Sequence, residues 1–215
     1  MKKHWVGVLG LTLLAGVSAP AQAQLQKVAP SPAPGTMWLH AERIPLVAGG
    51  FATAERGYYF APVNRNDPKS EVIGVEVYRF RRNASADPKT PPIFRLHGGP
   101  TFAGFERSLA ARGYYEREVQ PYLAITDFVV IGQRGIGSSR PNTVCERPRT
   151  LRYDDEAARV AAQHAAARRC QEFWRQWGVD LRGLTVMQAA ADVDDVRKAF
   201  GYDRIQIRGG SFGSH

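Results

Sequence analysis

Residues 209–213 read Gly209-Gly210-Ser211-Phe212-Gly213, a G-x-S-x-G sequence that directly follows Asp203-Arg204-Ile205-Gln206-Ile207-Arg208. The preceding stretch predicts a short strand. Glycines beside a serine allow the strained turn that presents a serine hydroxyl at the end of a strand, because no Cβ atoms crowd it. The same five residues also fit a strand-ending loop without chemistry. The surrounding sequence therefore decides whether Ser211 is a candidate nucleophile.

The segment before this strand carries the signals of a helix. Thr185 is followed three residues later by Gln188, which is the spacing of a capping box. Apolar residues then recur at three- and four-residue spacing across residues 189–200, and Gly201 follows as a left-handed C-cap. Helix, glycine, strand and serine turn come in the order of a doubly wound sheet, so we predict an α/β fold with a mostly parallel sheet.

A second glycine turn lies upstream, where His97-Gly98-Gly99-Pro100 follows the apolar run at residues 93–96. Backbone N–H groups of such a turn can stabilise the oxyanion that forms when a serine attacks a carbonyl. We expect Gly98 or Gly99 to supply one donor and Phe212 the other. An ordinary tight turn is the alternative for an isolated motif. His97 precedes the serine and stands at this corner, so we interpret it as structural rather than as a general base.

Together these motifs resemble the proline iminopeptidase and tripeptidyl aminopeptidase family of α/β-hydrolases, which joins HGGP after the third strand to GGSYG at the nucleophile. Residues 132–139, Gly-Gln-Arg-Gly-Ile-Gly-Ser-Ser, resemble the family's Asp-Gln-Arg-Gly-x-Gly-x-Ser turn, with Gly132 in place of aspartate. Residues 56–62 and 185–201 are similar to its first strand and a helix, and the resemblance covers residues 55–215. Arg134 is expected to hold loop carbonyls through its planar donors.

The resemblance implies an α/β-hydrolase fold with about the first five strands of a mostly parallel, doubly wound sheet. It implies a serine hydrolase that forms an acyl-enzyme on Ser211, without a metal or an organic cofactor, and that removes residues from peptide amino termini. Asp and His would follow this sequence, so the chain alone is expected to be inactive, with residues 204–207 at an open sheet edge. An esterase or lipase with the same machinery, and a non-catalytic exported fragment, are the alternatives.

The amino terminus has the composition of a secretory signal. Positive residues precede an apolar stretch at residues 5–17, and Ala21-Gln22-Ala23 supplies small residues for cleavage, so residues 1–23 are predicted to be a signal peptide. Residues 24–54 are interpreted as a leader or linker, and residues 55–215 as the hydrolase domain. The mature protein is expected to be secreted or periplasmic, without stable membrane insertion.

The net charge of the chain is +9, or +7 without Lys2 and Lys3. No nucleic-acid module is recognisable, and the expected partner is a peptide or a small ester substrate. The two cysteines, Cys145 and Cys170, fit an exported chain, where a single disulfide is the economical interpretation. Two cysteines are too few for a thiolate metal site, and no metal is expected.

Strands are expected near residues 57–63, 73–80, 93–96, 128–131 and 204–207. Helices are expected near residues 106–119, with a break at Gly113, and near residues 155–177 and 186–200. Within the second helix, one apolar stripe is interpreted as core packing; it consists of Cys170, Phe173, Trp174 and Trp177.

Overall fold

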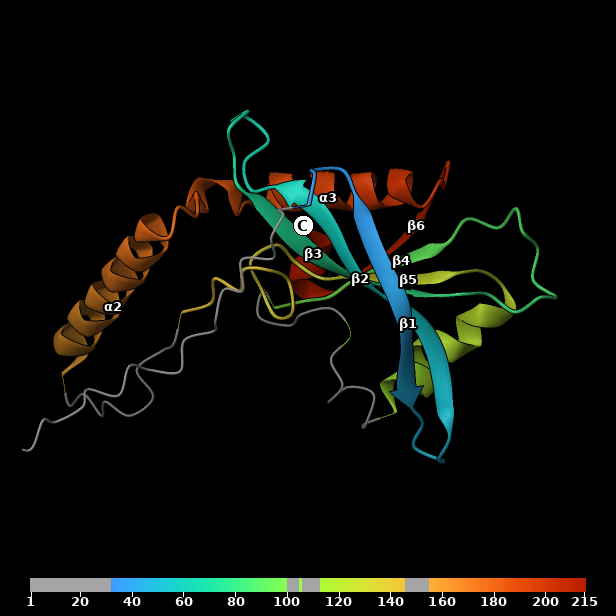
Figure 1. The fold of residues 1–215 in the computed structure, drawn as a ribbon. Coiled ribbons are helices and arrows are strands. Elements are labelled where there is room, and N and C mark those ends of the chain that lie inside the picture. The colour runs from blue at the N-terminus through green and yellow to red at the C-terminus, as the bar shows by residue number, and fades with distance from the viewer. Residues whose placement is uncertain (1–31, 100–104, 106–112, 146–154) are drawn as a thin grey trace, which may run out of the picture.

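The computed structural model describes residues 32–99, 105, 113–145 and 155–215, and its centre is one six-stranded sheet (Figure 1). The strand order is β1-β2-β3-β5-β4-β6. The strands are β1 (Met37–Pro45), β2 (Phe51–Pro62), β3 (Val72–Phe80), β4 (Ile93–Leu96), β5 (Phe128–Ile131) and β6 (Gln206–Gly209). The predicted signal peptide, residues 1–23, lies outside the described residues.

Two longer helices and several short helical turns complete the described chain. The long helices are α2 (Glu156–Gln176) and α3 (Val186–Ala199). The short elements are η1 (Tyr115–Val119), η2 (Gln120–Ala124), η3 (Leu181–Gly183) and η4 (Ser211–Ser214). The expected helix at residues 106–119 is described only over its last residues, where η1 is a π-helical turn that follows Gly113.

The prediction of a mostly parallel, doubly wound sheet is wrong. Strands β1, β2 and β3 pair antiparallel with one another, and β3 also pairs antiparallel with β5. Only β5, β4 and β6 are parallel neighbours. The reason is the length of the connections, because the short links between β1, β2 and β3 leave no room for the helical crossover that a parallel pair requires. The sheet is therefore mixed, with a parallel part at one side.

The sheet begins at Met37, within the segment that the sequence analysis treats as a leader. Strand β1 pairs with β2 along its whole length, from Met37 opposite Tyr59 to Pro45 opposite Phe51. Gly49 and Gly50, both with positive φ, form the turn between the two strands. Two adjacent glycines between strand-length segments are a recognised hairpin signal, and they identify this element in retrospect.

Each face of the sheet carries its own apolar cluster. On one face, Phe80, Phe128 and Val130 pack with residues of η1 and η2, among them Val119. On the other face, Phe94 and Val129 pack with Val196 of α3, which is fully buried. Alternate residues of a strand point to opposite faces, so neighbouring residues such as Phe128 and Val129 serve different clusters. The parallel part of the sheet is thus covered on both sides.

Helix α3 has the ends that its sequence predicts. Thr185 caps the amino end, and its Oγ1 accepts a hydrogen bond from the N–H of Gln188 at 3.3 Å. The Gln188 side chain does not return this bond but contacts Arg65 instead. Gly201 adopts a φ of +73°, and the N–H of Tyr202 donates to the carbonyl of Arg197 at 3.1 Å, which completes a Schellman motif.

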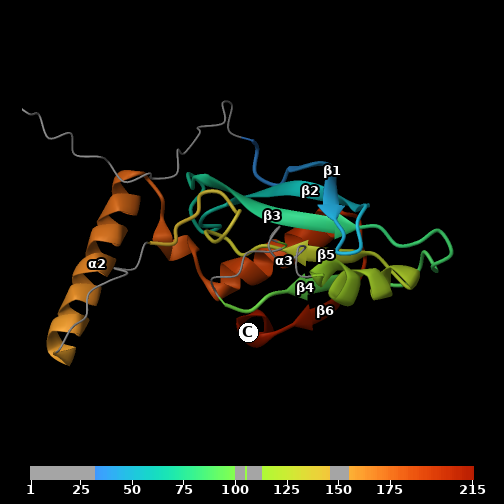
Figure 2. The ribbon, with the colours of Figure 1, turned by 90° about the horizontal axis from the view of Figure 1, so that it is seen from below.

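Helix α2 stands away from the sheet in both ribbon views (Figures 1 and 2). Asp155 caps its amino end by accepting hydrogen bonds from two backbone N–H groups. The predicted disulfide between Cys145 and Cys170 is present and ties the helix to the segment after β5, with the two Cα atoms 6.1 Å apart. Trp174 is buried, as expected for the apolar stripe, but Trp177 is 56% exposed and does not belong to a core.

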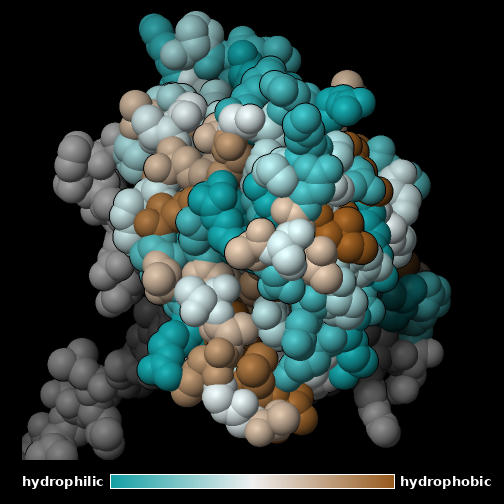
Figure 3. Space-filling model, turned by 90° about the vertical axis from the view of Figure 1, so that its right-hand side faces the viewer, coloured by the Kyte–Doolittle hydropathy of each residue, from teal (hydrophilic) through white to brown (hydrophobic). Residues whose placement is uncertain are grey.

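Strand β6 begins two residues later than predicted and forms one edge of the sheet. Ile207 is 61% exposed there, whereas Ile205 packs against the cluster beside α3. On the side of the molecule seen in Figure 3, apolar residues form separate small patches among hydrophilic ones. None of the helices in the described parts of the chain is long and apolar enough to cross a membrane.

Candidate active site

Ser211 lies at the carboxyl end of β6, where the strand turns into η4. Its φ is +53°, and among the described residues it is the one non-glycine with a positive φ. A left-handed backbone costs a non-glycine residue about 1 kcal/mol or more. Such strain persists where the surrounding structure imposes it, and it concentrates at functional sites. The predicted tight turn at Ser211 is therefore present.

The turn after β4 packs directly against Ser211. Strands β4 and β6 are parallel neighbours, so residues that follow them meet at the same edge of the sheet. A Cβ atom placed on Gly98 would lie 2.8 Å from Ser211 Cβ and 3.3 Å from Ser211 Oγ. Real Cβ atoms do not approach so closely, so only glycine fits at position 98. The structure thus brings together Gly98 and Ser211, which lie far apart in the sequence.

The backbone of η4 also lies against the end of β4. A Cβ on Gly213 would collide with the carbonyl oxygen of Leu96 and would lie 2.8 Å from that of His97. Within the described chain, the N–H groups of Gly98, Gly99 and Phe212 donate to no recorded partner. These are the donors that the sequence analysis assigns to an oxyanion. They lie at the edge of the sheet that carries Ser211.

The ring of His97 is partly buried and packs against Tyr114. Its Nε2 lies 2.9 Å from the hydroxyl of Tyr114, and the two rings are in contact. Burial, helped by the positive charge of Arg95, lowers the pKa of His97 from 6.5 to about 4. The imidazole is therefore neutral at pH 7. This environment agrees with the interpretation of His97 as a structural histidine.

Charged side chains of β4 and β6 lie next to this turn. Arg95 donates from Nη1 to the carbonyl of Arg208 at 3.1 Å, and its guanidinium lies 3.3 Å from the position of a Cβ on Gly210. Arg208 in turn forms an ion pair with Glu118 of η1 at 2.9 Å. Burial raises the pKa of the neighbouring Tyr114 hydroxyl, which stays protonated at neutral pH.

Gly132 lies at the end of β5 and is held against β3. Its N–H donates to the Glu76 carbonyl at 2.8 Å. A Cβ on Gly132 would lie 3.1 Å from Ser139 Oγ and 3.2 Å from Glu76 Cβ. Glu76 and Ser139 are both buried, and the Ser139 hydroxyl accepts a bond from the Glu76 N–H at 3.0 Å. These two side chains fill the space that the aspartate of the resembling family would need.

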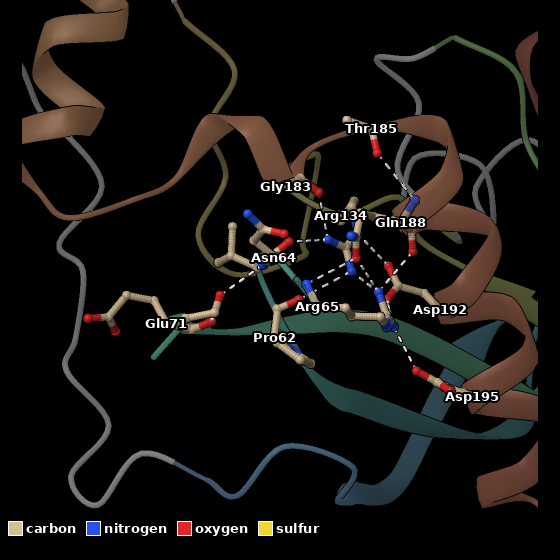
Figure 4. A network of polar contacts seen from close by, with 12 residues as sticks. Pro62, Asn64, Arg65, Glu71, Arg134, Gly183, Thr185, Gln188, Asp192 and Asp195 are labelled. Carbon is tan, nitrogen blue, oxygen red and sulfur yellow. Dashed lines mark hydrogen bonds and ion pairs between the residues drawn. The ribbon is translucent and has the colours of Figure 1, made fainter. Parts of the chain in front are cut away.

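Arg134 holds the loop after β5 in place, as its sequence context predicts (Figure 4). It is only 4% exposed, and its Nε and Nη2 donate to the two carboxylate oxygens of Asp192 at 2.8 and 2.6 Å. Its Nη1 donates to the carbonyls of Val63 and Gly183 at 2.6 and 2.7 Å. The guanidinium thus connects α3 to three segments, which are the loop that carries Arg134, the end of β2 at Val63 and the turn η3 at Gly183. We refer to Arg134 and Asp192 as the buried anchor.

Arg65 extends the buried anchor towards solvent. Its Nη2 donates to Asp192 at 2.6 Å and to Asp195 at 2.7 Å, while Nη1 contacts the side chain and carbonyl of Gln188 (Figure 4). Arg65 and Asp192 were not predicted as partners of Arg134. The sequence contains only a weak signal for these pairs. Asp192 and Asp195 are three residues apart and so share one face of a helix. The arginines that bind Asp192, Arg134 and Arg65, each lie more than fifty residues away in the sequence.

No base for Ser211 is found among the described residues. The described histidines have other neighbours, since His97 contacts Tyr114 and the ring of His215 lies 5.9 Å from the ring of Phe212. His40 is on β1, which is the opposite edge of the sheet from β6. His164 is on helix α2, outside the sheet. In the same described ranges, no three His, Cys, Asp or Glu side chains form a group that could bind a metal ion.

Comparison of the chain with known protein families and with curated proteins finds no match. The functional interpretation therefore depends on the geometry of the site.

Proposed function

We propose that the protein is an exported serine hydrolase in which Ser211 attacks the carbonyl carbon of its substrate. The observation that carries this proposal is the strained backbone of Ser211, whose φ of +53° places the residue on a tight turn beside Gly98. Strain of this kind is retained where it serves a function, and a serine raised on a strand-end turn is the arrangement of a nucleophile.

The neighbouring backbone donors support the proposal. When a serine adds to a carbonyl, negative charge develops on the carbonyl oxygen, and fixed N–H groups stabilise it. The N–H groups of Gly98 or Gly99 and of Phe212 have no described partner and lie at the edge that carries Ser211. In this proposal they bind the oxyanion, after which water releases the acyl group from Ser211.

The resemblance implies a general base and an acid that orients it, in the chain order Ser, Asp, His. The substrate class also comes from the resemblance, which favours cleavage at the amino terminus of peptides. Export is supported by the composition of residues 1–23 and by the disulfide between Cys145 and Cys170. The proposal concerns the site and does not depend on the predicted parallel sheet.

The test is covalent labelling with a fluorophosphonate probe in the full-length protein. Wild type and Ser214→Ala should be labelled, because Ser214 lies in the same turn but has an ordinary backbone. Ser211→Ala should abolish labelling, since the variant has no hydroxyl at residue 211 to displace fluoride and form the bond to phosphorus. Labelling that persists in Ser211→Ala refutes the proposal. In that case Ser138 is examined next, because Ser139 is buried and already bonded.

Activity on two substrate types then separates the peptidase from the esterase. An aminopeptidase should hydrolyse aminoacyl p-nitroanilides with a free amino group and lose this activity when the amino group is acetylated. Selective turnover of short-chain p-nitrophenyl esters, with no turnover of the anilides, would instead assign an esterase.

A further inference from the structure

We infer that Gln133 is a positioning residue that orients the oxyanion donor of Gly98. The inference rests on the proposed role of Ser211 and deepens it. Gln133 follows β5, and its Nε2 donates to the carbonyl oxygen of His97 at 3.0 Å. His97 is the residue directly before Gly98 in the turn after β4.

The rigidity of the peptide bond makes this contact specific. The carbonyl of His97 and the N–H of Gly98 belong to the same planar peptide unit and point in opposite directions. A hydrogen bond that holds the carbonyl therefore also fixes the direction of the N–H. Because the Gly98 backbone lies against Ser211, a rotation of this plane would turn the donor away from the oxyanion. Gln133 acts on the donor without touching the substrate.

The position of Gln133 is itself fixed. Arg134, the next residue, is buried and bonded to Asp192, Val63 and Gly183, so the chain at residue 133 cannot shift freely. The buried anchor thus connects α3 to the turn beside Ser211 through one adjacent residue. Strand β5 lies next to β4 in the sheet, which brings the two turns to the same edge.

Stability alone does not account for a glutamine here. The Oε1 atom of Gln133 is buried and has no hydrogen-bond partner among the described residues. A buried acceptor without a partner is unfavourable for folding. The single bond that the amide does make is directed at the His97 carbonyl. The residue is therefore better explained by the geometry it imposes than by the stability it adds.

The chain supplies a matched control for an experiment. Gln206 Nε2 donates to the carbonyl of Pro91 at 2.9 Å, which is the same type of bond at the opposite end of β4. Both Gln133→Met and Gln206→Met remove one amide donor from one backbone carbonyl. Only the first removes it from the peptide unit of Gly98. Gln133→Asn serves as a second variant, because its shortened amide stays polar but does not reach His97.

The measurements are the rate of fluorophosphonate labelling and the kcat and KM for p-nitrophenyl acetate, on full-length protein at equal folded fraction. We expect Gln133→Met and Gln133→Asn to lower the labelling rate and kcat by about tenfold to a hundredfold. This decrease is smaller than the one expected when an oxyanion donor is removed entirely. KM should stay within about twofold, since only transition-state binding changes. Gln206→Met should match wild type. The ³¹P resonance of the phosphonylated serine should shift in the Gln133 variants alone.

The outcomes separate the two proposals. Wild type without labelling, or labelling that survives Ser211→Ala, overturns the function proposed for Ser211. Labelling that depends on Ser211 but is the same in wild type, Gln133→Met and Gln133→Asn overturns only the role of Gln133. Equal losses in Gln133→Met and Gln206→Met also overturn it, because the effect would then be one of general stability.

Discussion

The turn that carries Ser211 follows β6, and the loop that carries Arg134 follows β5, on the other side of β4 in the mixed sheet, yet the two are built in opposite ways. Arg134 is 4% exposed, and its donors are bonded to a carboxylate and to backbone carbonyls. Ser211 has a strained backbone and is exposed, and its neighbouring N–H groups have no described partner. A saturated group can only hold other parts in place, whereas an unsaturated edge can bind a ligand.

On this difference we assign Arg134 to the support of the fold and propose chemistry for Ser211 alone. Both residues lie in glycine-containing turns after short strands, and their motifs predict different roles for them, a nucleophile for Ser211 and a contact to loop carbonyls for Arg134. The comparison predicts that changes at the buried anchor mainly alter stability, while changes at the Ser211 turn mainly alter reactivity. The following substitutions test this division.

The largest effect on stability is expected for Arg134→Met. It leaves Asp192 buried and bonded to Arg65 alone, so the free energy of unfolding should fall by about 3 kcal/mol, the lower end for breaking a buried ion pair. Arg175→Met is the matched control, since Arg175 makes a similar two-pronged contact with Glu172 on the exposed surface of α2. It should leave the denaturation midpoint unchanged. Equal effects of both variants in urea denaturation would show that Arg134 is not an anchor.

The mixed sheet shows which parts of the fold are predictable from sequence. Strands β4 and β5 lie at the predicted residues, and α3 has its predicted Thr185 cap and Gly201 C-cap, because these signals are local. The direction of β3 relative to β5 is not a local property. It depends on which strands become neighbours in the sheet. The link between β2 and β3, in contrast, is visible in the sequence. It is too short to contain a helix, and it therefore indicates an antiparallel pair.

The site shows the same division. The Ser211 turn and the Gly98 turn were predicted from contiguous motifs, and the structure places them in contact. The pairs Arg134–Asp192 and His97–Tyr114 were not predicted, because each joins residues distant in the sequence through side-chain packing. No local pattern specifies which buried arginine meets which carboxylate. Such pairs follow from the strand order, which the sequence did not supply.

Gly98→Ala is expected to lower the free energy of unfolding less than Arg134→Met does, but to lower the reactivity of Ser211 strongly. The added methyl group would meet Ser211 at 2.8 Å, so Ser211 or the turn must shift, at a cost of about 1–3 kcal/mol for overpacking. Fluorophosphonate labelling should fall at least tenfold, since the nucleophile and donor separate. Gly74→Ala is the control, because its methyl group meets the Tyr58 side chain at 3.1 Å on β3, away from Ser211, so labelling should stay at the wild-type level. Unchanged labelling in Gly98→Ala would contradict the packing of Gly98 against Ser211.

The smallest effect is expected for the contribution of His97 to the pH dependence of the free energy of unfolding. His97 lies between the Ser211 turn and the loop that carries Arg134. Its ring contacts Tyr114, and its carbonyl is bonded to Gln133. Burial lowers the pKa of His97 from 6.5 to about 4 in the folded protein. Between these two values the unfolded chain binds a proton that the folded protein does not, so the free energy of unfolding falls as the pH decreases from 6.5 to 4. Above pH 6.5 this contribution is constant.

The change should be on the order of 1 kcal/mol, after allowing for solvent screening of a ring that is not fully buried. His97→Gln cannot titrate, so its stability should depend less on pH in this range. Tyr114→Phe removes the hydroxyl but keeps the apolar surroundings, and because burial is the main cause of the pKa shift, it should retain the wild-type slope. Urea denaturation at half-unit pH steps measures all three proteins. If the slope disappears in Tyr114→Phe as well, the hydrogen bond rather than burial keeps His97 neutral.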